Sequence, residues 1–250
     1  MQYLETPPKL ISTQSYSTMP DEFRRRQPTE WADANRPGAS TDCFIEGPSF
    51  DADGNLYIVD VPFGRIFRIS PDCKWSLVAE YDGWPNGLKI ARDGRILVAD
   101  YRHGIMELDA RVGRMEKVLA SRNSESFRGC NDLHLAGNGD IYFTDQGQTG
   151  LHDPTGRVYR LAASGKLDCL ISTGVSPNGL VLDSAEAVLF VAHVSLGHVF
   201  VFAPSGELIA RIKSCAGNAC TNVAIRGDRL YITESATGTV LVADIGVLDR

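Results

Sequence analysis

The sequence lacks several features that would place it in other classes of protein. No run of 18 apolar residues occurs, so no membrane-spanning helix and no membrane partner are expected. The first residues show no basic stretch followed by an apolar one, so we expect no secretory signal and a cytoplasmic location. The formal net charge is −6, with acidic and basic residues interspersed, which argues against a nucleic-acid partner.

The six cysteines form no C-x-x-C pair, so a zinc cluster or a redox motif of that kind is not expected. They stand at irregular intervals, at positions 43, 73, 130, 169, 215 and 220. Free and mostly buried thiols are the simplest interpretation in the cytoplasm. Cys215 and Cys220 are close enough in sequence to form a bridge in an oxidising compartment.

What the sequence does contain is one motif written five times. A polar residue precedes a short apolar strand, a turn follows, and a second apolar strand ends in a polar or acidic residue. A third strand, opened by glycine, follows the motif. Repeats of about 40 to 50 residues built from short strands indicate the blades of a β-propeller. The five copies cover residues 43–60, 85–100, 130–145, 177–193 and 221–234.

The predicted fold is therefore all-β, with one propeller domain over residues 44–250, because a closed β array of this length is normally one domain. Residues 1–43 lack the repeat and form an N-terminal segment. Within it, residues 8–16 are the candidate fourth strand of the last blade, which otherwise lacks one. Residues 20–36 are charged and predict a surface loop with a helical turn.

One position of the repeat carries an oxygen-bearing side chain in every copy. Glu46, Asn86 and Asn131 each lie 14 residues before an acid, at positions 60, 100 and 145. Equivalent positions of a propeller converge on one axis, so these oxygens would ring a central channel and suit a hard cation such as Ca²⁺. The alternative is that Asn-Gly and Asn-Asp pairs are simply turn residues. The matching residues of the last two copies are Asn178 and Asn222.

Two further residues belong with this predicted ring. Trp84 stands just before Asn86 and would lie near the mouth of the channel, where propeller loops build a pocket, unless it only packs its hairpin. Asp132 follows Asn131 directly, so strand alternation turns it away from the axis and favours a supporting role.

The segments 44–48, 54–60, 129–133 and 176–180 resemble signatures of the regucalcin/gluconolactonase/luciferin-regenerating enzyme family, and the resemblance covers residues 44–244. It implies a six-bladed propeller that hydrolyses sugar lactones or related esters with one axial divalent cation, usually Ca²⁺ and in some members Zn²⁺. On that resemblance Glu46, Asn131 and Asn178 match metal-binding positions. Asn86, Asn222, Asp132 and Trp84 would bind substrate.

The sequence departs from the family in one respect. The family's aspartate ligand, which often serves as base or nucleophile, belongs to a blade that would fall at residues 192–193, and that repeat is absent. The catalytic residue is therefore unassigned. The resemblance implies a lactonase that uses the cation as a Lewis acid and an oriented water. The alternative is an inactive propeller that binds a small molecule or a protein. An incomplete ring would expose strand edges and favour association of chains.

Overall fold

The computed structural model describes residues 7–174, 176–179, 181–182, 188–193 and 196–248. These residues divide into two compact units. The larger unit holds residues 20–179, and the smaller unit holds residues 1–19 together with 180–250. No helix in the described ranges is long and apolar enough to cross a membrane.

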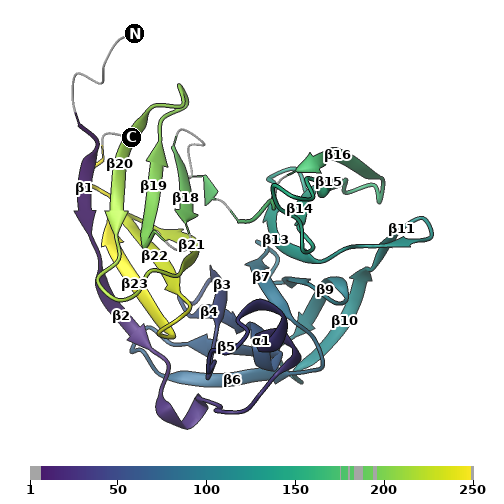
Figure 1. Cartoon of the computed structure of the whole chain (residues 1–250), viewed down its shortest axis with the longest axis horizontal. Coiled ribbons are helices and arrows are strands. Elements are labelled where there is room, and N and C mark those ends of the chain that lie inside the picture. The colour runs from purple at the N-terminus through teal and green to yellow at the C-terminus, as the bar shows by residue number, and fades with distance from the viewer. Residues whose placement is uncertain (1–6, 175, 180, 183–187, 194–195, 249–250) are drawn as a thin grey trace. The chain divides into compact units, whose positions relative to one another are not determined.

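Three antiparallel sheets of four strands make up most of the larger unit (Figure 1). In each sheet the strands follow one another in chain order, as in a propeller blade. The first contains β3 (Ile45–Phe50), β4 (Leu56–Asp60), β5 (Arg65–Ile69) and β6 (Trp75–Glu80). The second contains β7 (Pro85–Ile90), β8 (Ile96–Asp100), β9 (Gly104–Asp109) and β10 (Arg114–Leu119). The third contains β13 (Cys130–Leu135), β14 (Ile141–Asp145), β15 (Gly156–Leu161) and β16 (Leu167–Gly174).

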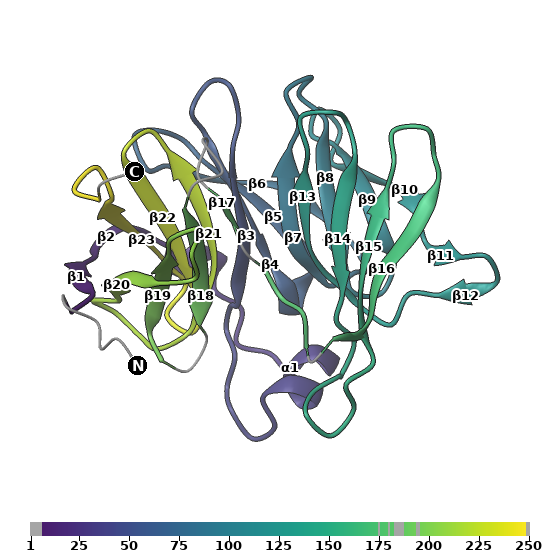
Figure 2. The same ribbon diagram turned by 90° about the horizontal axis from the view of Figure 1, so that it is seen from above.

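A small hairpin joins the second and third sheets. It consists of β11 (Ser121–Arg122) and β12 (Glu125–Ser126), and it extends away from both sheets in Figure 2.

Two further sheets form the smaller unit. One has the order β1 (Lys9–Ser12), β20 (Leu208–Lys213), β19 (His198–Phe202), β18 (Leu189–His193) and β17 (Val181–Leu182). The other has the order β2 (Gln14–Thr18), β23 (Thr239–Asp244), β22 (Arg229–Glu234) and β21 (Cys220–Arg226). The described residues thus form five blade sheets, and the prediction of a lactonase-type propeller with five repeats is confirmed.

The N-terminal strand divides between these two sheets. Residues 14–18 do supply the fourth strand of the last blade, antiparallel to β23. Residues 9–12 instead pair in parallel with β20 of the preceding blade. An N-terminal strand therefore does complete the last blade, but it begins at residue 14 and not at residue 8.

The second strands of the first two blades are buried on both faces, which explains their almost unbroken apolar sequences. Every residue of β4 and β8 is buried. Tyr57 and Val59 of β4 pack in one cluster with Leu88 and Val98 of the next sheet. Because each sheet is covered by its neighbour on this face, polar residues are confined to the strand ends and turns.

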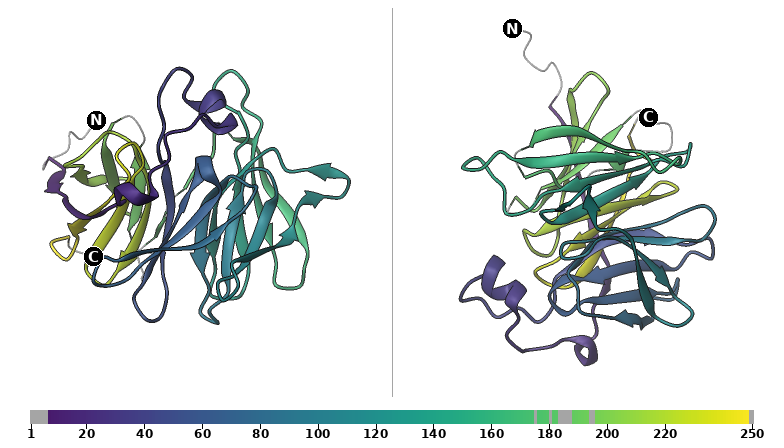
Figure 3. Two further views of the ribbon diagram at one scale, coloured as in Figure 1. Left: turned by 90° about the horizontal axis from the view of Figure 1, so that it is seen from below. Right: turned by 90° about the vertical axis from the view of Figure 1, so that its right-hand side faces the viewer.

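The segment before the first blade is more ordered than a surface loop. It contains the short helices η1 (Asp21–Phe23) and α1 (Glu30–Asn35), seen beside the first sheet in Figure 3. Thr29 caps α1 by accepting the Ala32 N–H at 3.1 Å. Buried Trp31 packs on Phe44 with ring centroids 4.6 Å apart, so α1 is anchored to the start of β3.

Candidate metal and substrate site

The predicted ring residues of the larger unit stand at β-bulges. Glu46 lies opposite Val59 and Ser49 lies opposite Tyr57, so three steps on β3 match two on β4. The register shifts in the same way beside Asn86 on β7 and beside Asn131 on β13. A bulge leaves an extra residue outside the ladder and re-aims its side chain. Asn86 and Asn131 therefore stand outside the ladder, whereas Glu46 keeps Val59 as its partner and the extra residue follows it.

Glycines allow successive inner strands to come together at these bulges. A Cβ on Gly47 would lie 2.6 Å from both Asn86 O and Leu88 N, so β3 and β7 touch through backbone. A Cβ on Gly87 would lie 2.4 Å from Asp132 Oδ1 and 2.7 Å from Asp132 Cα, so β7 and β13 do the same. Gly47 and Gly87, which follow Glu46 and Asn86, must therefore be small for the neighbouring strand to fit.

The amide groups of Asn86 and Asn131 are held in one orientation. Asn86 Nδ2 donates to Trp84 O at 3.0 Å, and a carbonyl only accepts, so the nitrogen must face it. Asn131 Nδ2 donates to Gln146 Oε1 at 2.6 Å. Within the described part of the chain, no hydrogen bond reaches either Oδ1. Both oxygens are thus available as ligands or acceptors.

Gln146 and Ser176 support this arrangement and were not found from the sequence. Gln146 Nε2 donates to Ser176 Oγ at 2.6 Å, which orients the oxygen that Asn131 uses. Gln146 directly follows the acid that ends β14, and this position is the only sequence signal for it.

Asp132 turns toward the second sheet. Its buried carboxylate lies against Gly87 and accepts the Leu133 N–H at 2.9 Å. The ammonium of Lys89, also missed from sequence, lies 3.9 Å from Asp132 Oδ1.

The last two asparagines occupy different surroundings. Asn178 is exposed and precedes β17, where its Oδ1 accepts the Gly179 N–H at 2.7 Å. Asn222 is buried on β21 of the smaller unit, next to a bulge between Cys220 and Asn222, and accepts the Val223 N–H at 2.8 Å.

Trp84 lines a cavity of ≈ 260 Å³ at the same end of the first two blades as Glu46 and Asn86. The Arg102 guanidinium stacks over its ring at 4.2 Å from the centroid, and Tyr101 packs beside it. The loops after β4 and before β7 supply other walls, including Phe63 and Tyr81.

The acids that end the second strands are structural. Asp60, Asp145 and Glu234 accept the backbone N–H of Phe44, Gly129 and Ala219, each at 2.7 to 2.8 Å. Each bond ties the end of the second strand to the loop just before the inner strand. Burial raises the pKa of Asp60, while the nearby Arg65 opposes the shift. Burial likewise raises the pKa of Asp145.

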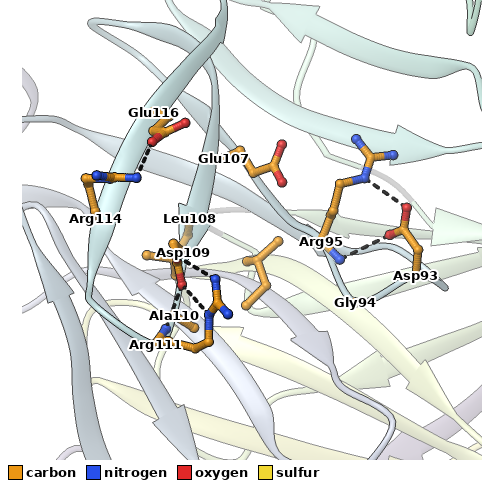
Figure 4. Close-up of a pocket in the computed structure, with 11 residues that line it drawn as sticks. Asp93, Gly94, Arg95, Glu107, Leu108, Asp109, Ala110, Arg111, Arg114 and Glu116 are labelled. Carbon is orange, nitrogen blue, oxygen red and sulfur yellow. Dashed lines mark hydrogen bonds and ion pairs between the residues drawn. The ribbon is translucent and has the colours of Figure 1, made fainter.

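A cavity of ≈ 540 Å³ lies at the opposite strand ends of the second blade (Figure 4). Its charges are paired with one another: Arg95 with Asp93, Arg111 with Asp109 and Arg114 with Glu116. Because these pairs are exposed and mutually satisfied, the cavity offers no preferred ligand chemistry.

The donor set suits a hard cation. The larger unit presents a carboxylate on β3 and two amide oxygens on β7 and β13, all from buried side chains at equivalent bulges. Among the described residues, no group of three or more His, Cys, Asp or Glu side chains converges on a metal position. A set of one carboxylate and two amide oxygens fits Ca²⁺ rather than a metal that prefers thiolate or imidazole ligands.

Comparisons with known proteins place these features in context. Residues 44–192 match the model of the SMP-30/Gluconolactonase/LRE-like region. A gluconolactonase of Zymomonas mobilis is 32% identical over 172 residues, which are 59% of this chain and 48% of that protein. The chain thus spans about half the length of that relative. The lactonase drp35 of Staphylococcus aureus is 25% identical over 97% of this chain and 79% of its own length.

Solved structures agree on the fold. A gluconolactonase of Xanthomonas campestris aligns with a TM-score of 0.69 at 18% identity, over 96% of this chain and 99% of that one. A calcium-binding regucalcin of Agrobacterium tumefaciens aligns with a TM-score of 0.68 at 16% identity, over 95% of each chain. Since the family model covers more than half of the sequence, the chain belongs to the SMP-30/gluconolactonase/LRE-like family.

Proposed function

We propose that this protein hydrolyses a lactone that binds to the inner-strand residues of the larger unit. The reaction uses one divalent cation, for which Ca²⁺ is the first candidate and Zn²⁺ the second. The observation that carries the proposal is the repeated bulge that presents Glu46, Asn86 and Asn131 at equivalent positions of three blades. The lactonase relatives support the same reaction class.

In this proposal Glu46, Asn131 and Asn178 hold the cation. Glu46 supplies the negative charge that favours a dication, and Gln146 keeps the Asn131 oxygen turned outward. A cation bound there supplies Lewis-acid polarisation of a carbonyl oxygen. To join this set, Asn178 must give up the hydrogen bond that its Oδ1 accepts from the Gly179 N–H.

The substrate side of the proposal uses Asn86, Asp132 and Trp84 of the larger unit. The outward oxygen of Asn86 accepts a hydroxyl proton, which suits a polyhydroxy lactone. Trp84 offers an apolar surface beside it, backed by Arg102. The carboxylate of Asp132 holds β13 against β7 and so fixes the spacing of Asn86 and Asn131.

The test is acid release from glucono-δ-lactone in a pH-stat, with Ca²⁺ or Zn²⁺ and after chelation. We expect hydrolysis above the spontaneous rate, its loss on chelation, and a fall of at least about 100-fold in Glu46→Gln. Glu116→Gln, on an exposed position of β10, is the matched control and should retain the wild-type rate. No release above the blank with either metal would favour the inactive binding propeller instead.

A further inference from the structure

A second row of polar side chains follows the ring residues along the inner strands of the larger unit. Ser49, Lys89 and His134 each stand three residues after Glu46, Asn86 and Asn131. Their partners across the ladder are Tyr57, Leu97 and Tyr142, which are also equivalent positions. We call Glu46, Asn86 and Asn131 the acceptor row, and Ser49, Lys89 and His134 the donor row.

On β3 the bulge places Glu46 of the acceptor row and Ser49 of the donor row on the same face of the sheet. On β3 the partners of Glu46 and Ser49 are Val59 and Tyr57, two residues apart on β4 and therefore on one face. Glu46 and Ser49 are three residues apart on β3, and the extra residue of the bulge accounts for the difference from the two-residue spacing on β4. The donor row consequently lies roughly 7–10 Å further along the strands than the acceptor row.

The chemistry of the two rows is opposite. The acceptor row offers a carboxylate and two outward amide oxygens. The donor row offers a hydroxyl, an ammonium and an imidazole, all of which donate hydrogen bonds. Ser49 Oγ already accepts the Ile90 N–H at 3.1 Å, which leaves its own hydrogen to donate.

Lys89 is the charged member of the donor row. Its side chain is 15% exposed, so most of its length is covered by protein. Among the described residues it forms an ion pair with Asp132, whose Oδ1 lies 3.9 Å from Nζ, a distance too long for a hydrogen bond. In the described ranges of the chain, no acceptor forms a hydrogen bond to its Nζ. An ammonium with three donors in a mostly covered position is suited to an anionic group of a ligand.

We propose that Lys89 is a specificity-determining residue that selects lactones carrying a carboxylate at the carbon furthest from the ring ester. The expected preference in hydrolysis rests on the proposed lactonase function, whereas the expected preference in binding the carboxylate does not. A six-carbon aldaric acid lactone spans the two rows, with its ring carbonyl at the acceptor row and its free carboxylate at the donor row. A charge-assisted hydrogen bond from Lys89 to that carboxylate would favour it over the neutral sugar lactone.

The first arm of the test is binding of the open acids by calorimetry with Ca²⁺ present. We expect the wild type to bind the diacid glucarate about 10- to 100-fold more tightly than the monoacid gluconate. Lys89→Met should remove most of this ratio and Lys89→Arg should keep part of it. Lys166→Met, at an exposed hairpin position, is the control that should leave the ratio unchanged.

The second arm compares kcat/KM for glucaro-1,4-lactone and glucono-δ-lactone. We expect Lys89→Met to lose about 10- to 100-fold on the acidic lactone and little on the neutral one. Equal binding of both acids by the wild type, or equal losses on both lactones, would overturn the inference. If neither lactone is hydrolysed while the glucarate preference depends on Lys89, the proposed function fails and the inference stands.

Discussion

Gly87 and Asp132 lie so close across two blades that a Cβ on the glycine would stand 2.4 Å from the carboxylate Oδ1. The same methyl would lie 2.9 Å from the backbone oxygen of Asn131. Because one of these contacts is to backbone, side-chain rotation alone does not relieve the clash. The spacing of the inner strands, and with it the spacing of the acceptor row, depends on this glycine.

Gly87→Ala is therefore expected to lower the free energy of unfolding by about 1–3 kcal/mol, because the substitution overpacks the contact between β7 and β13. Urea denaturation measures the change. Gly137→Ala is the matched control, since a Cβ there meets no atom within 4 Å. Equal effects of the two substitutions would show that the close approach does not constrain the strands.

The buried pair of Asp60 and Arg65 gives a second prediction. Arg65 donates to Asp60 Oδ2 from Nε at 2.9 Å and from Nη2 at 2.5 Å, and its Nη1 donates to Phe23 O at 2.6 Å. Asp60→Ala leaves a buried guanidinium without its anion, so we expect a loss of about 3–5 kcal/mol in the free energy of unfolding.

The exposed pair of Asp93 and Arg95 is the control for Asp60→Ala. Arg95→Ala should leave the denaturation midpoint unchanged, because solvent screens such a pair. A midpoint for Asp60→Ala as high as that of the wild type would contradict the structural role assigned to the strand-end acids.

The third prediction concerns the orientation of Asn131. Gln146→Met removes the acceptor that holds Asn131 Nδ2 while keeping a side chain of similar length. We expect Ca²⁺ affinity to fall about 10-fold or more, as happens when partners of metal ligands are removed, with little change in thermal stability. Gln148→Met, two residues further along the same loop, should bind Ca²⁺ as the wild type does. Unchanged affinity in Gln146→Met would argue that Asn131 is not a ligand.

The fourth prediction follows from a buried thiol of the smaller unit. Burial raises the pKa of the Cys220 thiol from its ordinary value of 9.0 to about 11. The thiol ionises more readily in the unfolded chain, so its stabilising contribution is complete below pH 9.0 and is lost as the pH rises toward about 11. The contribution changes by at most about 1.4 kcal/mol per pH unit.

Denaturation of Cys220→Ala at pH 8 to about 10.5 should therefore show a shallower fall of stability with pH than the wild type. Cys215→Ala, at an exposed free thiol, is the control and should follow the wild-type slope. Identical slopes for wild type and Cys220→Ala would mean that the buried thiol does not titrate as described.

The sequence predicted the blades well because a fixed spacing of 14 residues separates the bulge residue from the strand-end acid in most repeats. It could not place the N-terminal strands. Thr13 is buried between them, and its Oγ1 donates to Lys213 O and accepts the Cys215 N–H. The chain changes sheet at this residue, a tertiary contact that no local pattern encodes.

The candidate site was predicted in part for a related reason. The acceptor row contains one glutamate and two asparagines, all with oxygen-bearing side chains and all 14 residues before an acid, so its period is visible in the sequence. The donor row contains Ser49, Lys89 and His134, whose types differ, and only the strand register brings them into line. Asn178 has the right sequence context, but its Oδ1 bonds the next N–H, a local turn that competes with the strand.

The central claim is that Glu46, Asn131 and Asn178 hold a divalent cation. Calorimetric titration of Ca²⁺ into the wild type, Glu46→Gln and Glu116→Gln tests it most directly. We expect one binding site in the wild type and in Glu116→Gln, and no measurable binding in Glu46→Gln. The glutamine keeps the shape of the Glu46 side chain but removes its negative charge. Equal affinity in all three proteins would contradict it.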